Sequence, residues 1–256
     1  MRGKDFVREM DALAQPVAKM AAESAGELLS NLNDDEAFRL LAQFWYIEGP
    51  TIGHYSRSWW NSIPSDPTGK YGDVELLLAR QLYDESRHGK LYADACVRKG
   101  YIQDSRELYG HPYSKPVPAW LNFTTWLIHL GNHHFTTLYA GEQLASEGLI
   151  FPQVLKATVK ALQDPVVKWV FEAQEDEEAF HGMCGKYVVT KYCQTPELQA
   201  EAAWAVETTL RLEAEAFADL GKFVKDGITV PRPAPPDYSN GATRTRRMPR
   251  VLDQSR

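Results

Sequence analysis

The pattern Glu-x-x-His occurs twice in the chain, at Glu85–His88 and at Glu178–His181, each time in a segment with helical apolar spacing. Residues three apart occupy neighbouring positions on one helix face, so each copy presents a carboxylate beside an imidazole. The copies lie 93 residues apart, and a glycine follows each histidine (Gly89 and Gly182). This repetition predicts two helical units that bring their polar pairs together.

Each pair also has a partner acid in the preceding apolar segment. Glu48 lies 37 residues before Glu85, and Glu142 lies 36 residues before Glu178. Burying a carboxylate costs several kcal/mol unless it is paired or bound to a metal. We therefore predict a two-metal site; the alternative is a set of ordinary buried ion pairs and caps, because Glu-x-x-His pairs also arise by chance. The predicted ligands are Glu48, Glu85, His88, Glu142, Glu178 and His181.

The periodicity predicts an all-α protein, because almost every segment has helical spacing and no convincing run alternates as a strand does. Proline, glycine and capping residues divide the chain into helices. The predicted helices cover residues 4–30 (interrupted at Pro16), 35–60 (kinked at Pro50), 73–99, 119–146, 152–162, a segment that opens at Asp164-Pro165 and carries Glu178, and 196–225.

Length and composition indicate one large domain over residues 1–230, since 256 residues with 44% apolar content can build a full core. Residues 231–256 differ, with five prolines and six arginines, and are predicted to form an extended tail. The net charge of −6 argues against binding to nucleic acids or anionic membranes. No apolar run is long enough to span a membrane, and three cysteines at no metal-ligand spacing favour a reduced, cytoplasmic protein.

The predicted ligand set favours particular metals. Oxygen-rich ligation with one imidazole per ion suits iron(II) or manganese(II) better than zinc or copper. Four carboxylates match the charge of two divalent ions, and glutamates can bridge metals and change their binding mode. We expect Glu48, Glu142 and Glu178 to take part in catalysis in this way.

Two short elements resemble known proteins. Asp84-Glu85-Ser86-Arg87-His88 resembles the Asp-Glu-x-Arg-His signature of the ferritin-like di-iron carboxylate oxygenases, which include the multicomponent monooxygenase hydroxylases. The second element, Glu177-Glu178-Ala179-Phe180-His181, departs from that signature at its first and fourth positions, and both elements resemble the catalytic subunit of phenylacetyl-coenzyme A epoxidases. The resemblance implies a ferritin-like four-helix bundle with additional N- and C-terminal helices. It also implies that Asp84 and Arg87, and by duplication Glu177, orient the ligands.

By this resemblance the protein is expected to be a non-haem di-iron monooxygenase or oxidase. It would hold two iron ions, cycling between Fe2+ and Fe3+, and use dioxygen to hydroxylate, epoxidise, N-oxygenate or cleave a small organic substrate. Electrons must come from a separate reductase or ferredoxin, because the chain has no flavin signature and no iron–sulfur cysteines. The alternatives are a manganese catalase or peroxidase, and a non-enzymatic ferritin-like store or partner subunit. A homodimer is expected from the long apolar helices.

For several further polar residues the sequence allows a functional or a purely structural role. Ser146, four residues after Glu142, is a candidate for oxygen handling. Glu213 and Glu215 are predicted to be solvated or interhelical charges. Structural hydrogen bonds are the favoured role of His129, His133 and His134.

Overall fold

Every regular element in residues 2–227, the part of the chain that the computed structural model describes, is helical. The predicted all-α helical bundle with additional N- and C-terminal helices is confirmed. The elements, in order, are α1 (Gly3–Leu28), α2 (Asp34–Glu48), α3 (Ile52–Asn61), α4 (Gly72–Arg98), the 3-10 turns η1 (Ser105–Tyr109) and η2 (Pro112–Ser114), α5 (Pro118–Leu130), α6 (Phe135–Tyr139), the π-helix η3 (Ala140–Ile150), α7 (Phe151–Ala161), α8 (Pro165–Glu172), α9 (Glu175–Tyr192) and α10 (Pro196–Asp226).

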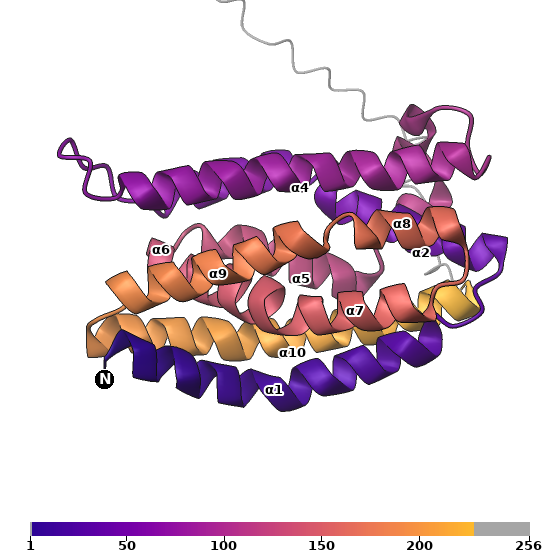
Figure 1. Ribbon diagram of the computed structural model, residues 1–256. Coiled ribbons are helices and arrows are strands. Elements are labelled where there is room, and N and C mark those ends of the chain that lie inside the picture. Colours follow the sequence, from indigo (N-terminus) through magenta and orange to yellow (C-terminus); the bar gives the residue numbers. More distant parts are fainter. Residues whose placement is uncertain (1, 228–256) are drawn as a thin grey trace, which may run out of the picture.

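The helices pack in pairs that bring distant parts of the sequence together. α2 packs along α4, α9 along the π-helix η3, α1 along α7, and α10 along both α5 and η3. Figure 1 shows α4 on one side of the molecule and α1 and α10 on the opposite side, with α9 and α5 between them. The pairs α2–α4 and η3–α9 carry the residues singled out in the sequence.

Several helix ends follow local chemistry that the sequence predicts. Asn33 caps α2, since its side chain accepts from the backbone N–H of Glu36 and the Glu36 carboxylate accepts from that of Asn33. Asp164 accepts from the backbone of Val166 and Val167 at the start of α8. α10 ends at Gly227, which has a φ of 63° that suits glycine.

Three of the predicted helix interiors are wrong. α1 continues through Pro16, because its buried alanine-rich face packs on α7 and offsets one lost hydrogen bond. Pro50 separates α2 from α3 instead of kinking one helix. The segment 119–146 breaks after Leu130, where Gly131 lies against the backbone of Ser58 so closely that a Cβ atom would sit 2.4 Å from its carbonyl.

A break also divides the segment that carries Glu178, between α8 and α9. Gln174 lies at this break with its side chain fully buried, and its amide donates to the Tyr92 hydroxyl at 3.0 Å and to the carbonyl of Val170 at 3.0 Å. Because of this break, residues Glu175–Glu178 form the first turn of α9, where their negative charges interact favourably with the helix dipole.

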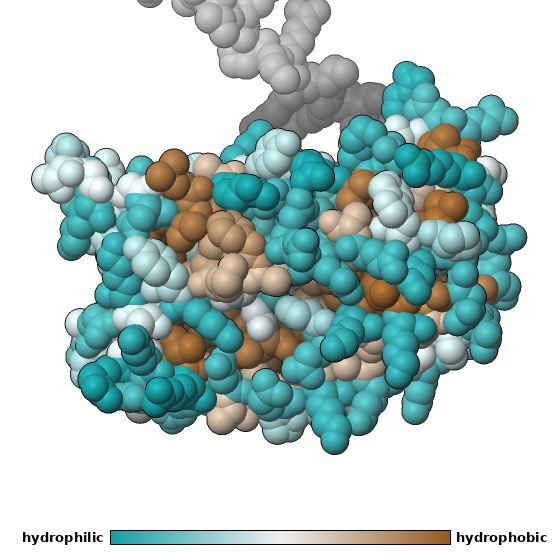
Figure 2. Space-filling model, viewed as in Figure 1, coloured by the Kyte–Doolittle hydropathy of each residue, from teal (hydrophilic) through white to brown (hydrophobic). Residues whose placement is uncertain are grey.

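The surface has one feature that composition does not show. Apolar side chains gather on the face where α4 and α9 lie (Figure 2). Leu76 is 74% and Met183 61% exposed there. Among the described residues no helix combines the length and apolar character needed to cross a bilayer. The predicted tail, 231–256, lies outside the described residues.

Candidate metal centre

The structure brings five of the six predicted ligands to one buried place. Glu48 is the last residue of α2, Glu85 and His88 lie on α4, and Glu178 and His181 lie on α9. Both imidazoles are fully buried, and the three carboxylates are less than a tenth exposed. Glu85 belongs to two groups of close donor atoms, one with Glu48 and His88 and the other with Glu178 and His181.

One half of the site is centred on Nδ1 of His88. This nitrogen lies 3.5 Å from Oε2 of Glu48. It lies 3.6 Å from Oε1 of Glu178 and 3.7 Å from Oε2 of Glu85. One imidazole nitrogen thus faces three carboxylate oxygens from three helices, a group of donors that could hold a divalent metal ion.

The other half is centred on Nδ1 of His181. This nitrogen lies 3.3 Å from Oε2 of Glu147. Oε1 of Glu85 is 3.5 Å away, and Oε2 of Glu178 is 3.9 Å away. Glu85 and Glu178 each turn one oxygen toward His88 and the other toward His181. Both are therefore placed to bridge two ions, whereas Glu48 and Glu147 each face a single imidazole.

The outer nitrogens of both imidazoles contact acids that precede the ligand glutamates, and the contacts are crossed between the two halves. Nε2 of His88 lies 2.7 Å from Glu177 on α9, and Nε2 of His181 lies 3.3 Å from Asp84 on α4. Arg80 donates to Asp84 at 2.6 Å, and Arg87 donates to Glu177. An acid at Nε2 favours the tautomer that leaves Nδ1 free to bind a metal. The predicted orienting residues Asp84, Arg87 and Glu177 all lie in such contacts.

Glu147, which is not among the ligands predicted from the sequence, occupies in the second half the place that Glu48 occupies in the first. Glu142 and Glu147 are five residues apart, and an α-helix would put them on different faces. The π-helix η3 forms i to i+5 hydrogen bonds, so residues five apart share one face. The amide of Gln81 donates to both oxygens of Glu147, at 3.0 Å and 2.8 Å, and holds it toward His181.

Glu142 lines the same cavity as the other glutamates, but its carboxyl group does not contact the imidazole of His88 or His181. Its side chain is 5% exposed, and burial raises its pKa well above the usual range, with the Glu147 carboxylate adding to the shift. The protonated carboxyl can then donate a hydrogen bond to Glu147. The predicted role of Glu142 as a ligand stays a prediction.

The buried carboxyl groups and imidazoles of the site shift one another's pKa values. Burial raises the pKa of Glu48, Glu85 and Glu178. Burial opposes the charged form of His88, but the carboxylates around it raise its pKa to about 10. In the same way the pKa of His181 is raised to about 9, chiefly by the Glu147 carboxylate. Protons on the two imidazoles thus offset part of the carboxylate charge that two divalent ions would offset.

Unpaired buried atoms give an independent test of whether the residues fit two metal ions. Six polar atoms of this cluster are buried without a hydrogen-bond partner among the described residues. Leaving such atoms unpaired costs about 1–3 kcal/mol each. Ligation would satisfy them, so the donor set fits two ions. The atoms are Oε2 of Glu48, Oε1 of Glu85, Nδ1 of His88, Oε2 of Glu142, Oε2 of Glu178 and Nδ1 of His181.

The glycines that follow the two histidines bring the helices of each pair together. A Cβ atom on Gly89 would lie 2.5 Å from the carbonyl oxygen of Glu48. A Cβ atom on Gly182 would lie 2.6 Å from Cα of Gly148, which follows Glu147. The glycine after each histidine therefore lets α4 pack directly on α2, which carries Glu48, and α9 pack directly on η3, which carries Glu147.

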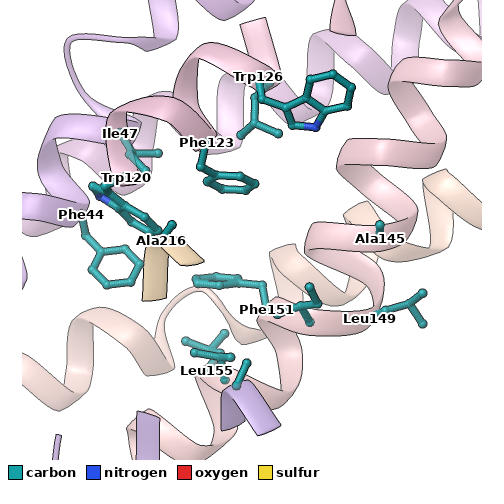
Figure 3. Close-up of a cluster of buried hydrophobic side chains, with 14 of the residues drawn as sticks. Phe44, Ile47, Trp120, Phe123, Trp126, Ala145, Leu149, Phe151, Leu155 and Ala216 are labelled. Atoms are coloured by element: carbon teal, nitrogen blue, oxygen red, sulfur yellow. The ribbon is translucent and has the colours of Figure 1, made fainter. Parts of the chain in front are cut away.

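A cavity of about 50 Å³ adjoins the carboxylates. Its aromatic walls come from several helices, and Figure 3 shows Phe44, Trp120, Phe123 and Phe151 gathered around a common space. The predicted oxygen-handling residue Ser146 is buried and lines this cavity. These walls suit a small, largely apolar compound.

Two predictions outside the ligand set have different outcomes. Glu215 is exposed and pairs with Arg211 at 3.2 Å, but Glu213 is 1% exposed and lines the cavity. Of the two predicted roles, solvated or interhelical charge, the solvated one is therefore wrong for Glu213. His133 contacts Glu201 at 2.7 Å and His129 at 3.2 Å.

His134 accepts from the backbone of Thr136 at 3.3 Å and caps α6. The three clustered histidines therefore have the structural roles that were favoured for them.

Comparisons with known proteins place the fold. No protein-family profile matches the chain, and no curated protein matches it in sequence. A domain of unknown function with a heme oxygenase-like fold from Shewanella denitrificans OS217 has a TM-score of 0.63 and 18% identity, over 85% of this chain and 95% of that chain. A TenA homologue from Pseudomonas syringae pv. tomato str. DC3000 has a TM-score of 0.60 and 13% identity, over 84% and 93%. At these identities the likeness shows a shared all-helical, heme oxygenase-like fold and nothing of activity.

Proposed function

From a heme oxygenase-like helical fold that encloses two facing imidazole–carboxylate clusters, we propose that the chain is a non-haem di-iron oxygenase or oxidase. The observation that supports this most is the sharing of Glu85 and Glu178 between the two imidazoles, at 3.5–3.9 Å. An isolated buried ion pair would not need two acids that each face two histidines. Paired donor sets of this kind, one imidazole to each, are typical of di-iron carboxylate bundles.

The residues of the chain divide the work of such a site. Glu85 and Glu178 would bridge the ions, with Glu48 and His88 completing one donor set and Glu147 and His181 the other. Two irons, when bound, would supply the electrons and the open positions that dioxygen needs. Glutamate ligation allows the oxygens to shift between binding modes as charge changes, and Glu142 is placed to supply another oxygen or to hold a proton beside Glu147.

The cavity supports the same function. Phe44, Trp120 and Phe151 keep bulk water from the carboxylates and leave space for a small organic substrate. Excluding water protects a reactive oxidant from side reactions. Electrons would come from a separate reductase or ferredoxin, and a cytoplasmic homodimer remains our expectation for the assembly.

Metal analysis followed by rapid mixing tests the proposal. Anaerobic reconstitution with Fe2+ should load about two irons per chain, and mixing the reduced protein with dioxygen should give a transient absorption band in the stopped flow. Glu178→Gln should lose the band and most of the metal. Glu175→Gln is the matched control, because Glu175 is exposed one turn earlier on the same helix.

Other results of the metal analysis and rapid mixing would favour a different function. Selective loading of manganese with rapid dismutation of peroxide would favour a catalase and overturn the oxygenase. Slow uptake of many irons per chain, without the transient, would favour iron storage. Full metal loading and activity in Glu178→Gln would overturn the ligand set itself.

A further inference from the structure

Glu213 is a buried acid of the cavity that the metal centre does not use. It lies on α10, a helix that carries none of the proposed ligands, and its side chain is 1% exposed. The hydroxyl of Ser146 contacts its carboxyl group, but Oε2 of Glu213 has no hydrogen-bond partner among the described residues. Glu213 lines the cavity, so this buried atom is available to a group that enters it.

Aromatic rings line the same cavity as this acid. Phe217 lies one turn further along α10 and packs on Trp120, with ring centroids 5.6 Å apart. Trp120 in turn stacks on Phe123 at 6.0 Å, and all three rings line the cavity with Glu213. Ring faces together with one carboxylate form a favourable environment for an ammonium group.

The charges of the cavity lining leave Glu213 without a positive partner. No lysine or arginine is among the residues that line the cavity. Two metal ions would balance the four glutamates around His88 and His181 and leave no positive charge for the acid on α10, and burial raises the pKa of the Glu213 carboxyl well above its usual range. A cation that enters with the substrate would stabilise the charged form of this carboxyl.

We propose that Glu213 binds the ammonium group of a small amine substrate, whose carbon chain lies between the aromatic rings and the metal centre. The substrate class is thus a short primary amine, in keeping with a cavity of about 50 Å³. This assignment rests on the proposed function for its chemistry, but the binding step requires only Glu213 and the rings.

Binding of n-butylamine, with 1-butanol as its neutral counterpart, tests the assignment. Calorimetry on the iron-loaded, full-length protein without dioxygen should show the amine binding about tenfold more tightly than the alcohol. Glu213→Gln should remove that preference by weakening amine binding about tenfold and leaving the alcohol unchanged. Glu213→Asp keeps the charge and should retain part of the preference.

Glu215→Gln is the matched control, since it makes the same change two residues away on the exposed side of α10. It should leave both affinities unchanged. Circular dichroism on each variant checks that the helices form, and metal content is measured on the same samples.

The outcomes separate this inference from the proposed function. Equal amine affinity in the wild type and Glu213→Gln would overturn the assignment, whether the amine bound the iron or did not bind at all. If that protein still loaded two irons and gave the transient with dioxygen, the proposed oxygenase function would be supported although the amine site was not. Amine binding that depends on Glu213 in a protein that takes up no iron on reconstitution would uphold the amine site and overturn the oxygenase.

Discussion

Glu147 places its Oε2 atom 3.3 Å from Nδ1 of His181, although in an α-helix it would lie on a different face from Glu142. The relationship depends on the π-helix, because i to i+5 bonding brings Glu147 onto the face that Glu142 occupies. It makes the two halves of the site equivalent, with Glu48 in one and Glu147 in the other.

Isosteric substitutions decide between the two acids of the π-helix. Glu147→Gln should lower the metal content from about two ions to about one, because the donor set around His181 loses its only unshared carboxylate. Glu142→Gln should keep about two ions. The measurement is elemental analysis after reconstitution, and the reverse result would show that Glu142 is the ligand.

The acids at the outer imidazole nitrogens should control metal affinity without being ligands. Asp84→Asn and Glu177→Gln each weaken the hydrogen bond that orients an imidazole, so each should cost about 10- to 100-fold in affinity for Fe2+. Competition with a chelator measures this loss. Asp94→Asn, which alters a surface pair with Lys90, should have no effect.

Metal binding should become tighter as pH rises. Without metal the pKa of His88 is about 10 and that of His181 about 9, so both imidazoles are charged at neutral pH. Each must lose its proton to bind an ion, so binding releases at least about two protons and the affinity rises up to about pH 10. Calorimetry in buffers of different ionisation enthalpy counts these protons.

A matched pair of histidine variants completes that measurement. His88→Gln should lower the proton count by about one, and His54→Gln, at an exposed position on α3, should not change it. Release of less than one proton from the wild type would show that the imidazoles are not ligands.

The glycines after the histidines should tolerate no side chain. Gly89→Ala and Gly182→Ala place a methyl group 2.5 Å and 2.6 Å from opposing backbone atoms. Each should lower the free energy of unfolding by about 1–3 kcal/mol through overpacking, and weaken metal binding as the helices separate. Denaturant unfolding measures the first effect.

Gly53 on α3 is the control for this pair, because nothing lies within 4 Å of a Cβ atom there. Gly53→Ala should leave metal binding unchanged and raise stability by up to about 1 kcal/mol. Equal stability effects at all three positions would contradict the close packing.

The sequence by itself determined the helical class, several helix boundaries and five of the residues that meet at the site. Periodicity and capping act within a few residues, so Asp164 could be assigned as a cap without a structure, whereas the sequence left Asn33 and Asp34 as alternatives at the start of α2. The repeated Glu-x-x-His spacing likewise identifies Glu85 and His88 as one pair on one helix face. These features depend on local geometry, which the chain carries in its order of residues.

Packing between helices that are distant in the sequence establishes which acids face which imidazole. The π-helical turn that presents Glu147 is held by packing against α9 and α10, and no local pattern distinguishes it from an α-helix. The crossed contacts of Asp84 and Glu177 depend on how α4 and α9 lie side by side. The burial of Glu213 depends on α10 packing against η3. Interactions between helices far apart in sequence have no local signature, because their free energy arises only when the surfaces meet.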